Sequence, residues 1–271
     1  MVHSQRNRND IQTHKATGTL QMPPRVRQPS VSRPIEVGWF LDVDEAAAMY
    51  PDPIPIAHLH KKVQRNKKSP DYCPAVQSFN RNLFVLLAPY DLTLSCNEKP
   101  GSFEFTMETG ASTISPGSLR NVLFVTPPLE WRSQNRPVIQ LRCPYVFVSD
   151  DNVTVEQTAP WLHYHQPTWP GVAIAGAFEI RNWVRPLSWA FEWYELSRPL
   201  VIRAGEPWSY VRLIPASKSI VKLARIERTN AIADLQKQVT GITNYTSNAL
   251  DLIGRVEARR PARLLPKRRS A

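Results

Sequence analysis

Hydrophobic and polar residues alternate in short runs along most of the chain, from about residue 73 to about residue 214. Residues 92–96 and 103–107 place an apolar side chain at every second position, while Leu83–Ala88 is apolar throughout. A period of two is typical of strands with one buried face, and a short continuous apolar run fits a strand covered on both faces. The predicted strands are 83–88, 92–96, 103–107, 121–125, 138–141, 145–148, 153–157, 172–180, 189–193, 200–203 and 208–214. Because turn residues separate them without an intervening helical period, we predict a mainly β protein with an antiparallel, jelly-roll-like β-sandwich body.

The pattern changes near residue 216. No proline falls between Ala216 and Arg260, and apolar side chains recur there near helical spacing. They are Leu235, Val239, Ile242, Tyr245, Ala249, Leu252 and Val256. We therefore predict a helical segment over residues 216–257, with a break near Gly241. The spacing of roughly 3.5 residues favours a coiled-coil seam between two copies, and docking of the helix on its own sandwich is the alternative.

Surplus positive charge is concentrated at the two ends of the chain. Residues 1–34 carry six Lys or Arg and one Asp, and residues 255–271 carry seven Lys or Arg and one Glu. Removing both ends from the totals of 34 basic and 23 acidic residues leaves 21 of each for residues 35–254. The predicted organisation is a disordered basic arm (1–34), a β-sandwich domain (35–215), the helical segment (216–257) and a disordered basic tail (258–271).

Two short segments outside the predicted strands contain residues that are typical of a helix start or of a turn. Residues 44–50 begin with Asp44, a good helix N-cap, and continue with helix-forming residues up to Pro51, which predicts about two helical turns. Glu206-Pro207 follows Gly205, and this combination is typical of a turn between two strands.

Aromatic residues supply the candidate binding site. Six of the eight tryptophans lie between Trp161 and Trp208, and the alternation over residues 189–193 places three aromatic rings on one strand face, as in a core. The aromatic residues of the proline-rich loop 160–170 are harder to bury, and two arginines and an asparagine follow them. Such a combination can form a platform for a sugar or a base. The predicted ligand-binding residues are Trp161, Tyr164, Trp169, Arg181, Asn182 and Arg185.

Metal binding and catalysis have weaker support. His163 and His165 would share one face of a strand, as ligands of many β-barrel metal sites do. Residues 166–170 supply no carboxylate, so we predict no metal ligand, no cofactor and no catalytic residue, and we favour a protein that is not an enzyme. The three cysteines form no paired spacing, which predicts free thiols rather than disulfides.

Five segments carry a family resemblance, and they follow one another in the expected order. They are Tyr50–Pro55, Cys73–Val76, Cys143–Phe147, Gly176–Pro186 and Arg203–Tyr210. Over roughly residues 45–214 the chain resembles an uncharacterised family of tailed bacteriophages and bacteria that is known only as a domain of unknown function. The resemblance implies a β-rich fold and a phage or phage-related origin, and it implies no catalytic or binding residue.

These observations lead to three hypotheses on function. The first is a non-enzymatic binding or structural protein, phage-related, that recognises a partner or a small polar ligand through the aromatic and arginine residues. The second is a nucleic-acid-associated accessory protein whose basic ends and basic stretch 61–68 contact phosphates. The third is a metal-dependent β-barrel enzyme built on His163 and His165. No apolar run approaches 18 residues, so we expect no membrane contact and a location in the cytoplasm, or in the host cytoplasm or virion if the chain is phage-encoded. The helical segment makes a homo-oligomer a further expectation.

Overall fold

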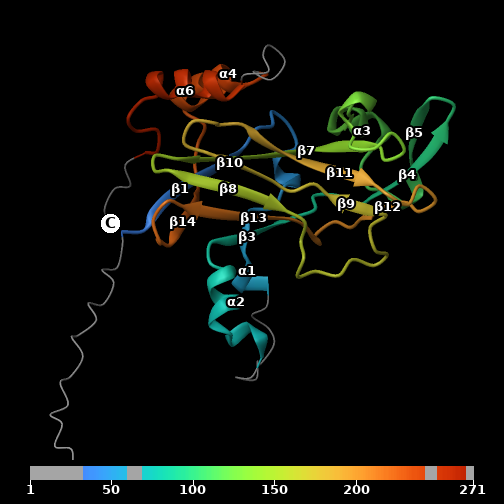
Figure 1. Cartoon of the computed structure of the whole chain (residues 1–271), viewed down its shortest axis with the longest axis horizontal. Helices are drawn as coiled ribbons and strands as arrows, with labels where there is room; N and C mark the ends of the chain where they lie inside the picture. Colours follow the sequence, from blue (N-terminus) through green and yellow to red (C-terminus); the bar gives the residue numbers. More distant parts are fainter. Residues whose placement is uncertain (1–32, 60–68, 242–248, 267–271) are drawn as a thin grey trace, which may run out of the picture. The chain divides into compact units, whose positions relative to one another are not determined.

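Two sheets face each other across the main hydrophobic core in the computed structural model, which describes residues 33–59, 69–241 and 249–266 (Figure 1). The first sheet has the order β14 (Val221–Arg225), β1 (Ile35–Leu41), β7 (Val138–Ser149), β11 (Pro186–Trp193) and β9 (Gly171–Ala173), and β6 (Leu123–Val125) also pairs with β7. The second has the order β10 (Gly176–Glu179), β8 (Val153–Thr158), β13 (Pro207–Pro215), β3 (Leu83–Leu87) and β2 (Ile54–Pro55). A smaller sheet contains β12 (Leu200–Ile202), β4 (Leu92–Lys99) and β5 (Ser102–Met107). The prediction of a mainly β, antiparallel sandwich is confirmed.

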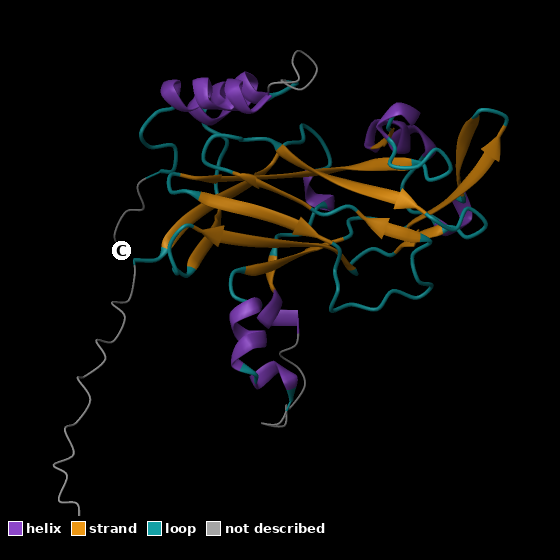
Figure 2. Cartoon of the chain, viewed as in Figure 1, coloured by secondary structure: helices purple, strands orange, loops and turns teal. Residues whose placement is uncertain are grey.

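Short helices and turns lie at the periphery of the strands (Figure 2). The α-helices are α1 (Ile56–Leu59), α2 (Pro74–Phe79), α3 (Pro116–Val122), α4 (Asn230–Val239) and α6 (Ala249–Arg259). The 3₁₀ turns are η1 (Ala47–Met49), η2 (Pro70–Tyr72), η3 (Thr109–Ala111) and η4 (Pro128–Glu130). In the described part of the chain, no helix is long and apolar enough to cross a bilayer.

The central strands are apolar on both faces because both faces are covered. On β1, Val37 and Trp39 enter the main core between the sheets, whereas Phe40 points to the opposite side of the same sheet. On β3, Phe84 and Leu86 enter the main core, while the intervening residues of the strand join a separate cluster on the outer face of the second sheet. This explains why Leu83–Ala88 reads as a continuous apolar run rather than an alternating one.

The segment 216–257 is not helical throughout, which corrects the prediction for its first part. Val221–Arg225 forms β14, which pairs in parallel with β1, an exception among the otherwise antiparallel pairs of described strands. Helix α4 begins only after Thr229, whose hydroxyl accepts a hydrogen bond from the Ile232 amide at 3.3 Å. It ends at Val239, with Thr240 as its C-cap, and Gly241 follows with a φ of 72°, so the predicted break is confirmed.

The apolar stripe of these helices packs against the chain's own sheet. Buried side chains of α4 and α6 join Phe40, Val146, Val148 and Val184 in one cluster. The helical members are Ile232, Leu235, Val239 and Val256. Docking in cis therefore buries Leu235, Val239 and Val256 of the predicted stripe, so these three side chains are not free to form a coiled-coil seam. A homo-oligomer stays a prediction. Ile242 and Tyr245 lie outside the described residues.

The basic tail is docked over its described part, contrary to the predicted disorder from residue 258. Leu264 and Leu265 are buried in the cluster beneath α4 and α6. Their backbone amides donate to the Asp150 carboxylate at 2.8 and 3.1 Å. The predictions for residues 1–32, 61–68 and 267–271 lie outside the described residues.

Candidate functional site

The residues predicted to bind a ligand make three separate sets of contacts. The first two involve the loop after β8. Trp161 packs edge-on against Tyr210 at 4.8 Å between ring centroids. Trp169 instead stacks on His165 at 3.9 Å and lies edge-on to Trp189, one of the core rings. Tyr164 is 71% exposed. Trp169 therefore packs against the main core, whereas Trp161 is 42% exposed and takes part in a different set of contacts.

The arginines and the asparagine make a third set of contacts. Arg181 donates to the Asp150 carbonyl and lies 3.9 Å from the Glu257 carboxylate. Asn182 is buried, and Arg185 lies over the Trp183 ring, where burial lowers the pKa of its guanidinium. Arg181 thus attaches the loop after β10 to Glu257 of α6, whereas Arg185 packs on Trp183 of its own loop.

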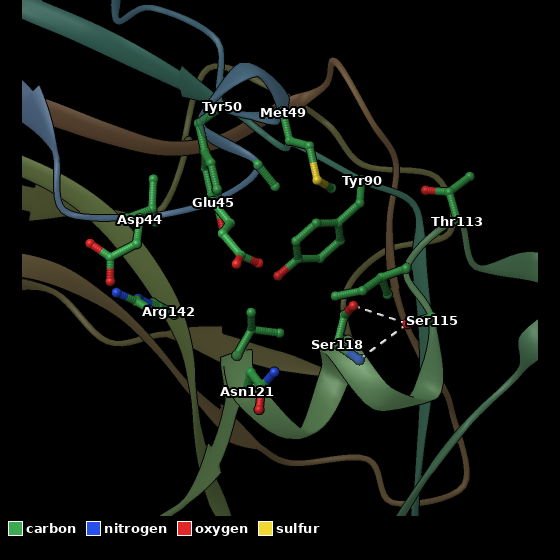
Figure 3. Close-up of a pocket in the computed structure, with 14 residues that line it drawn as sticks. Asp44, Glu45, Met49, Tyr50, Tyr90, Thr113, Ser115, Ser118, Asn121 and Arg142 are labelled. Atoms are coloured by element: carbon green, nitrogen blue, oxygen red, sulfur yellow. Dashed lines mark hydrogen bonds between the residues drawn. The ribbon is translucent and has the colours of Figure 1, made fainter.

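A hollow of about 540 Å³ lies elsewhere, where three segments distant in sequence meet (Figure 3). The segments are residues 43–50, the stretch 113–122 that contains α3, and β7 at Arg142, with Tyr90 between them. The lining residues are Val43, Asp44, Glu45, Ala46, Met49, Tyr50, Tyr90, Thr113, Ile114, Ser115, Ser118, Asn121, Val122 and Arg142. A volume of this size is in the range of about 300–1,000 Å³ that is usual for small-molecule sites.

One wall of the hollow comes from the segment that we predicted to be a two-turn helix. Only Ala47–Met49 forms a single 3₁₀ turn, and Ala46 before it adopts a left-handed conformation with φ 53° and ψ 25°. This conformation costs an alanine about 1–2 kcal/mol and directs the chain away from a helix. As a result Asp44 caps no helix, and Figure 3 shows the side chains of Asp44 and Glu45 at the hollow.

The opposite wall is α3, which we did not predict, although Ser115-Pro116 is a signal for the start of a helix. Ser115 caps the helix: its hydroxyl oxygen accepts from the Ser118 amide at 3.1 Å, and Pro116 occupies the first helical turn. The predicted strand 121–125 therefore starts too early, because α3 continues to Val122 before β6 begins. The helix places Ser118 and Asn121 along the hollow (Figure 3).

Two tyrosines with neutral phenol groups border the hollow. Tyr90 is 2% exposed, and its hydroxyl has no hydrogen-bond partner among the described residues. Burial is the main cause that raises the pKa of Tyr90, and the nearby Tyr50 and Cys143 add to it. Burial also raises the pKa of Tyr50, against a smaller opposing effect of Arg142. Both phenols are therefore hydrogen-bond donors at neutral pH.

Arg142 supplies the positive charge of the site. It is an exposed residue of β7, and its Nη2 donates to the Asp42 carbonyl at 2.7 Å. This bond holds the guanidinium beside the hollow, and Figure 3 shows Arg142 and Asp44 pointing toward each other. The rim thus combines one cation with the carboxylates of Asp44 and Glu45.

A second polar cluster involves the histidine pair. One ligand atom each from His163, His165 and Glu206 lie within 4.8 Å of one another. We predicted no metal ligand because residues 166–170 supply no carboxylate, but the carboxylate of this cluster comes from Glu206, in the turn before β13. Burial is the main cause that lowers the pKa of His165, and the backbone hydrogen bond to Pro207 opposes it. His165 is therefore a neutral imidazole at pH 7.

Comparisons with protein-family models, with curated proteins and with solved structures find no match for this chain. The resemblance to the phage and bacterial family stays a prediction. What the chain does has to be inferred from the geometry of its own side chains.

Proposed function

We propose that this chain is a non-enzymatic binding protein that takes a small, neutral, hydroxyl-rich molecule of the monosaccharide class into the hollow of Figure 3. The observation that carries the proposal is the Tyr90 hydroxyl, which lines this hollow, is buried and has no partner among the described residues. A buried hydroxyl without a hydrogen bond costs about 1–3 kcal/mol. A ligand oxygen that accepts this bond would remove that cost.

The lining favours a ligand that both donates and accepts hydrogen bonds. Tyr90 and Arg142 can donate, while the Asp44 and Glu45 carboxylates can accept. Asn121 can do both. A ligand with several hydroxyl groups satisfies all of these groups, whereas an anion would be repelled by the two carboxylates. The apolar part of the lining, which includes Met49, suits the carbon face of a sugar ring.

The phage-related part of the proposal rests on the sequence resemblance. Two of the segments that carry it border the site, because Tyr50–Pro55 begins at a lining residue and Cys143–Phe147 follows Arg142 directly. On this basis we place the chain among phage-encoded binding proteins of the host cytoplasm or the virion.

The proposal can be tested with sugars as probes. Glucose, galactose and N-acetylglucosamine are each titrated into the full chain, and binding is followed by ligand-observed NMR. Tyr90→Phe removes only the hydroxyl, so we expect it to weaken binding of the best sugar about tenfold, the value of one hydrogen bond of roughly 1.4 kcal/mol. Tyr164→Phe is the matched control, because Tyr164 is exposed and does not line the hollow.

Two results would overturn the proposal. One is that none of the three sugars binds the full chain. The other is that a sugar binds Tyr90→Phe and Tyr164→Phe with equal affinity, since binding would then occur away from the hollow.

A further inference from the structure

The cluster of His163, His165 and Glu206 joins two loops at one end of the sandwich. The histidines belong to the segment 159–170 that connects β8 to β9, and Glu206 ends the turn that leads into β13. The candidate ligand atoms of the three side chains all lie within 4.8 Å of one another.

His165 is held in the orientation that a metal ligand requires. Its Nε2 lies 2.9 Å from the Pro207 carbonyl oxygen, and a carbonyl can only accept, so Nε2 carries the hydrogen. The other ring nitrogen, Nδ1, is then left with its lone pair. Trp169 stacks on the ring at 3.9 Å and is itself fixed by a 2.9 Å hydrogen bond from its Nε1 to the Val201 carbonyl. Metal-binding histidines usually donate their second nitrogen to a carbonyl or carboxylate in this way.

The ring of His163 has a nitrogen without a hydrogen bond that lies close to the Glu206 carboxylate. Its Nε2 is buried and has no hydrogen-bond partner among the described residues. The nearest carboxylate oxygen, Oε2 of Glu206, is 3.9 Å away, which is too long for a hydrogen bond. Two ligands of one tetrahedral zinc ion, each about 2.1 Å from the metal, are separated by about 3.4 Å. A shift of about half an ångström would therefore bring these two atoms to the separation of two ligands of one ion.

Glu206 is presented by a fixed backbone. The amide of Ala88 donates to the Glu206 carbonyl at 2.9 Å, and the Gly205 amide donates to the Ala88 carbonyl at 2.9 Å. Gly205 has a φ of 79°, which a residue with a side chain adopts only with strain. The turn thus fixes the position from which the carboxylate extends towards the histidines.

We propose that His163, His165 and Glu206 bind one divalent transition-metal ion, with zinc as the ion that fits two imidazoles and one carboxylate best. Imidazole suits zinc, copper, iron and nickel, and a single carboxylate completes a common three-residue ligand set. Three protein ligands leave at least one coordination position for water or for a donor atom of a small molecule. The site is separate from the hollow proposed to bind a sugar, and either can exist without the other.

The test uses the full chain after removal of metal with a chelator and dialysis. Zinc is titrated by calorimetry, and cobalt is added in a parallel sample because its visible absorption reports the ligand geometry. We expect one zinc ion per chain, a rise in melting temperature with zinc, and at least 100-fold weaker binding in His163→Gln and in Glu206→Gln.

His58→Gln is the control, because His58 is an exposed histidine on α1 outside the cluster, and this variant should bind zinc like the unmodified chain. The metal-free melting temperatures of all variants establish that each one is folded. The proposal is wrong if the full chain binds neither zinc nor cobalt, or if folded His163→Gln and Glu206→Gln bind zinc as tightly as His58→Gln.

Discussion

Replacing Arg260 by alanine should destabilise the protein far more than an ordinary surface substitution. The Arg260 side chain is 2% exposed, although the sequence places it in a basic tail. Its Nη2 donates to the Asp150 carboxylate at 2.9 Å and to the Ser149 carbonyl at 2.8 Å, and its Nε donates to the Arg181 carbonyl at 2.7 Å. One guanidinium therefore connects the end of β7, the loop after β10 and the segment after α6.

The expected loss of stability follows from the buried groups that Arg260→Ala leaves without their partner. Removing one partner of a buried ion pair costs about 3–5 kcal/mol. The side chain of Asp150 is 22% exposed and keeps the amides of Leu264 and Leu265 as hydrogen-bond donors. We therefore expect the free energy of unfolding to fall by about 3 kcal/mol, the lower end of that range. For a chain of this size each kcal/mol lowers the melting temperature by about 2–4 °C, which gives a decrease of roughly 6–12 °C.

Thermal and urea unfolding of Arg260→Ala and Arg259→Ala would check this. Arg259 is the exposed neighbour, and its substitution should stay within about 0.5 kcal/mol of the unmodified chain. A chain truncated after residue 259 should lose still more stability, because Leu264 and Leu265 would also leave their cluster. If Arg260→Ala and Arg259→Ala unfold within 1 kcal/mol of each other, the tail is not docked as described.

Three further predictions concern the buried groups and the amino terminus. Tyr90→Phe should leave the unfolding free energy in urea unchanged or raise it by about 1 kcal/mol, because it removes an unpaired hydroxyl, and a loss above 1 kcal/mol would mean that the hydroxyl has a partner. A thiol titration of the native protein at pH 8 should find one reactive cysteine, the exposed Cys73. The other two should not react, because burial raises the pKa of Cys96 to about 12 and also raises the pKa of Cys143. All three should react after denaturation. Deleting residues 1–32 removes five Lys or Arg and one Asp, so the shortened chain should elute from a heparin column at lower salt than the full chain. Elution of both chains at the same salt concentration would contradict a role of this arm in polyanion binding.

Most strands of the sandwich could be predicted because their signal is local. The alternation over residues 153–157 and the apolar run at 83–88 depend only on which faces of a strand are covered. Two further predicted boundaries were wrong. The single strand predicted over 172–180 is two strands, β9 and β10, which belong to different sheets, and β7 is one strand that we divided at Pro144. The pairing of β11 with β7 passes from Val146 to Cys143 between consecutive residues of β11, so an irregularity in the ladder accommodates the proline within one continuous strand.

The end of the chain could not be predicted in the same way, because its structure depends on distant residues. Val221–Arg225 has apolar residues that fit either a helix or a strand, and it becomes a strand by pairing with β1, almost two hundred positions earlier. Arg260 carries the same charge as its exposed neighbours. Only the proximity of Asp150 distinguishes it, and a single sequence does not show that contact.

The candidate sites illustrate the same limit. The pair His163 and His165 could be recognised from spacing, but Glu206 appeared to be only a turn residue. Tyr90 lies in the turn between β3 and β4, whereas Arg142 lies on β7, and neither residue belongs to a motif, so the hollow has no signature in the sequence. The aromatic residues were noticed because tryptophan is rare, yet Trp169 proved to be packed against the core and tied to β12.

The most direct test of the proposed function is a crystal structure of the full chain soaked with the sugar that binds best in the titrations. We expect the sugar in the hollow, with one of its oxygens about 2.5–3.0 Å from the Tyr90 hydroxyl. We also expect contacts from the sugar to Arg142 or to the carboxylates of Asp44 and Glu45. A sugar bound elsewhere, or a Tyr90 hydroxyl already bonded to a protein group in the sugar-free crystal, would contradict the proposed function.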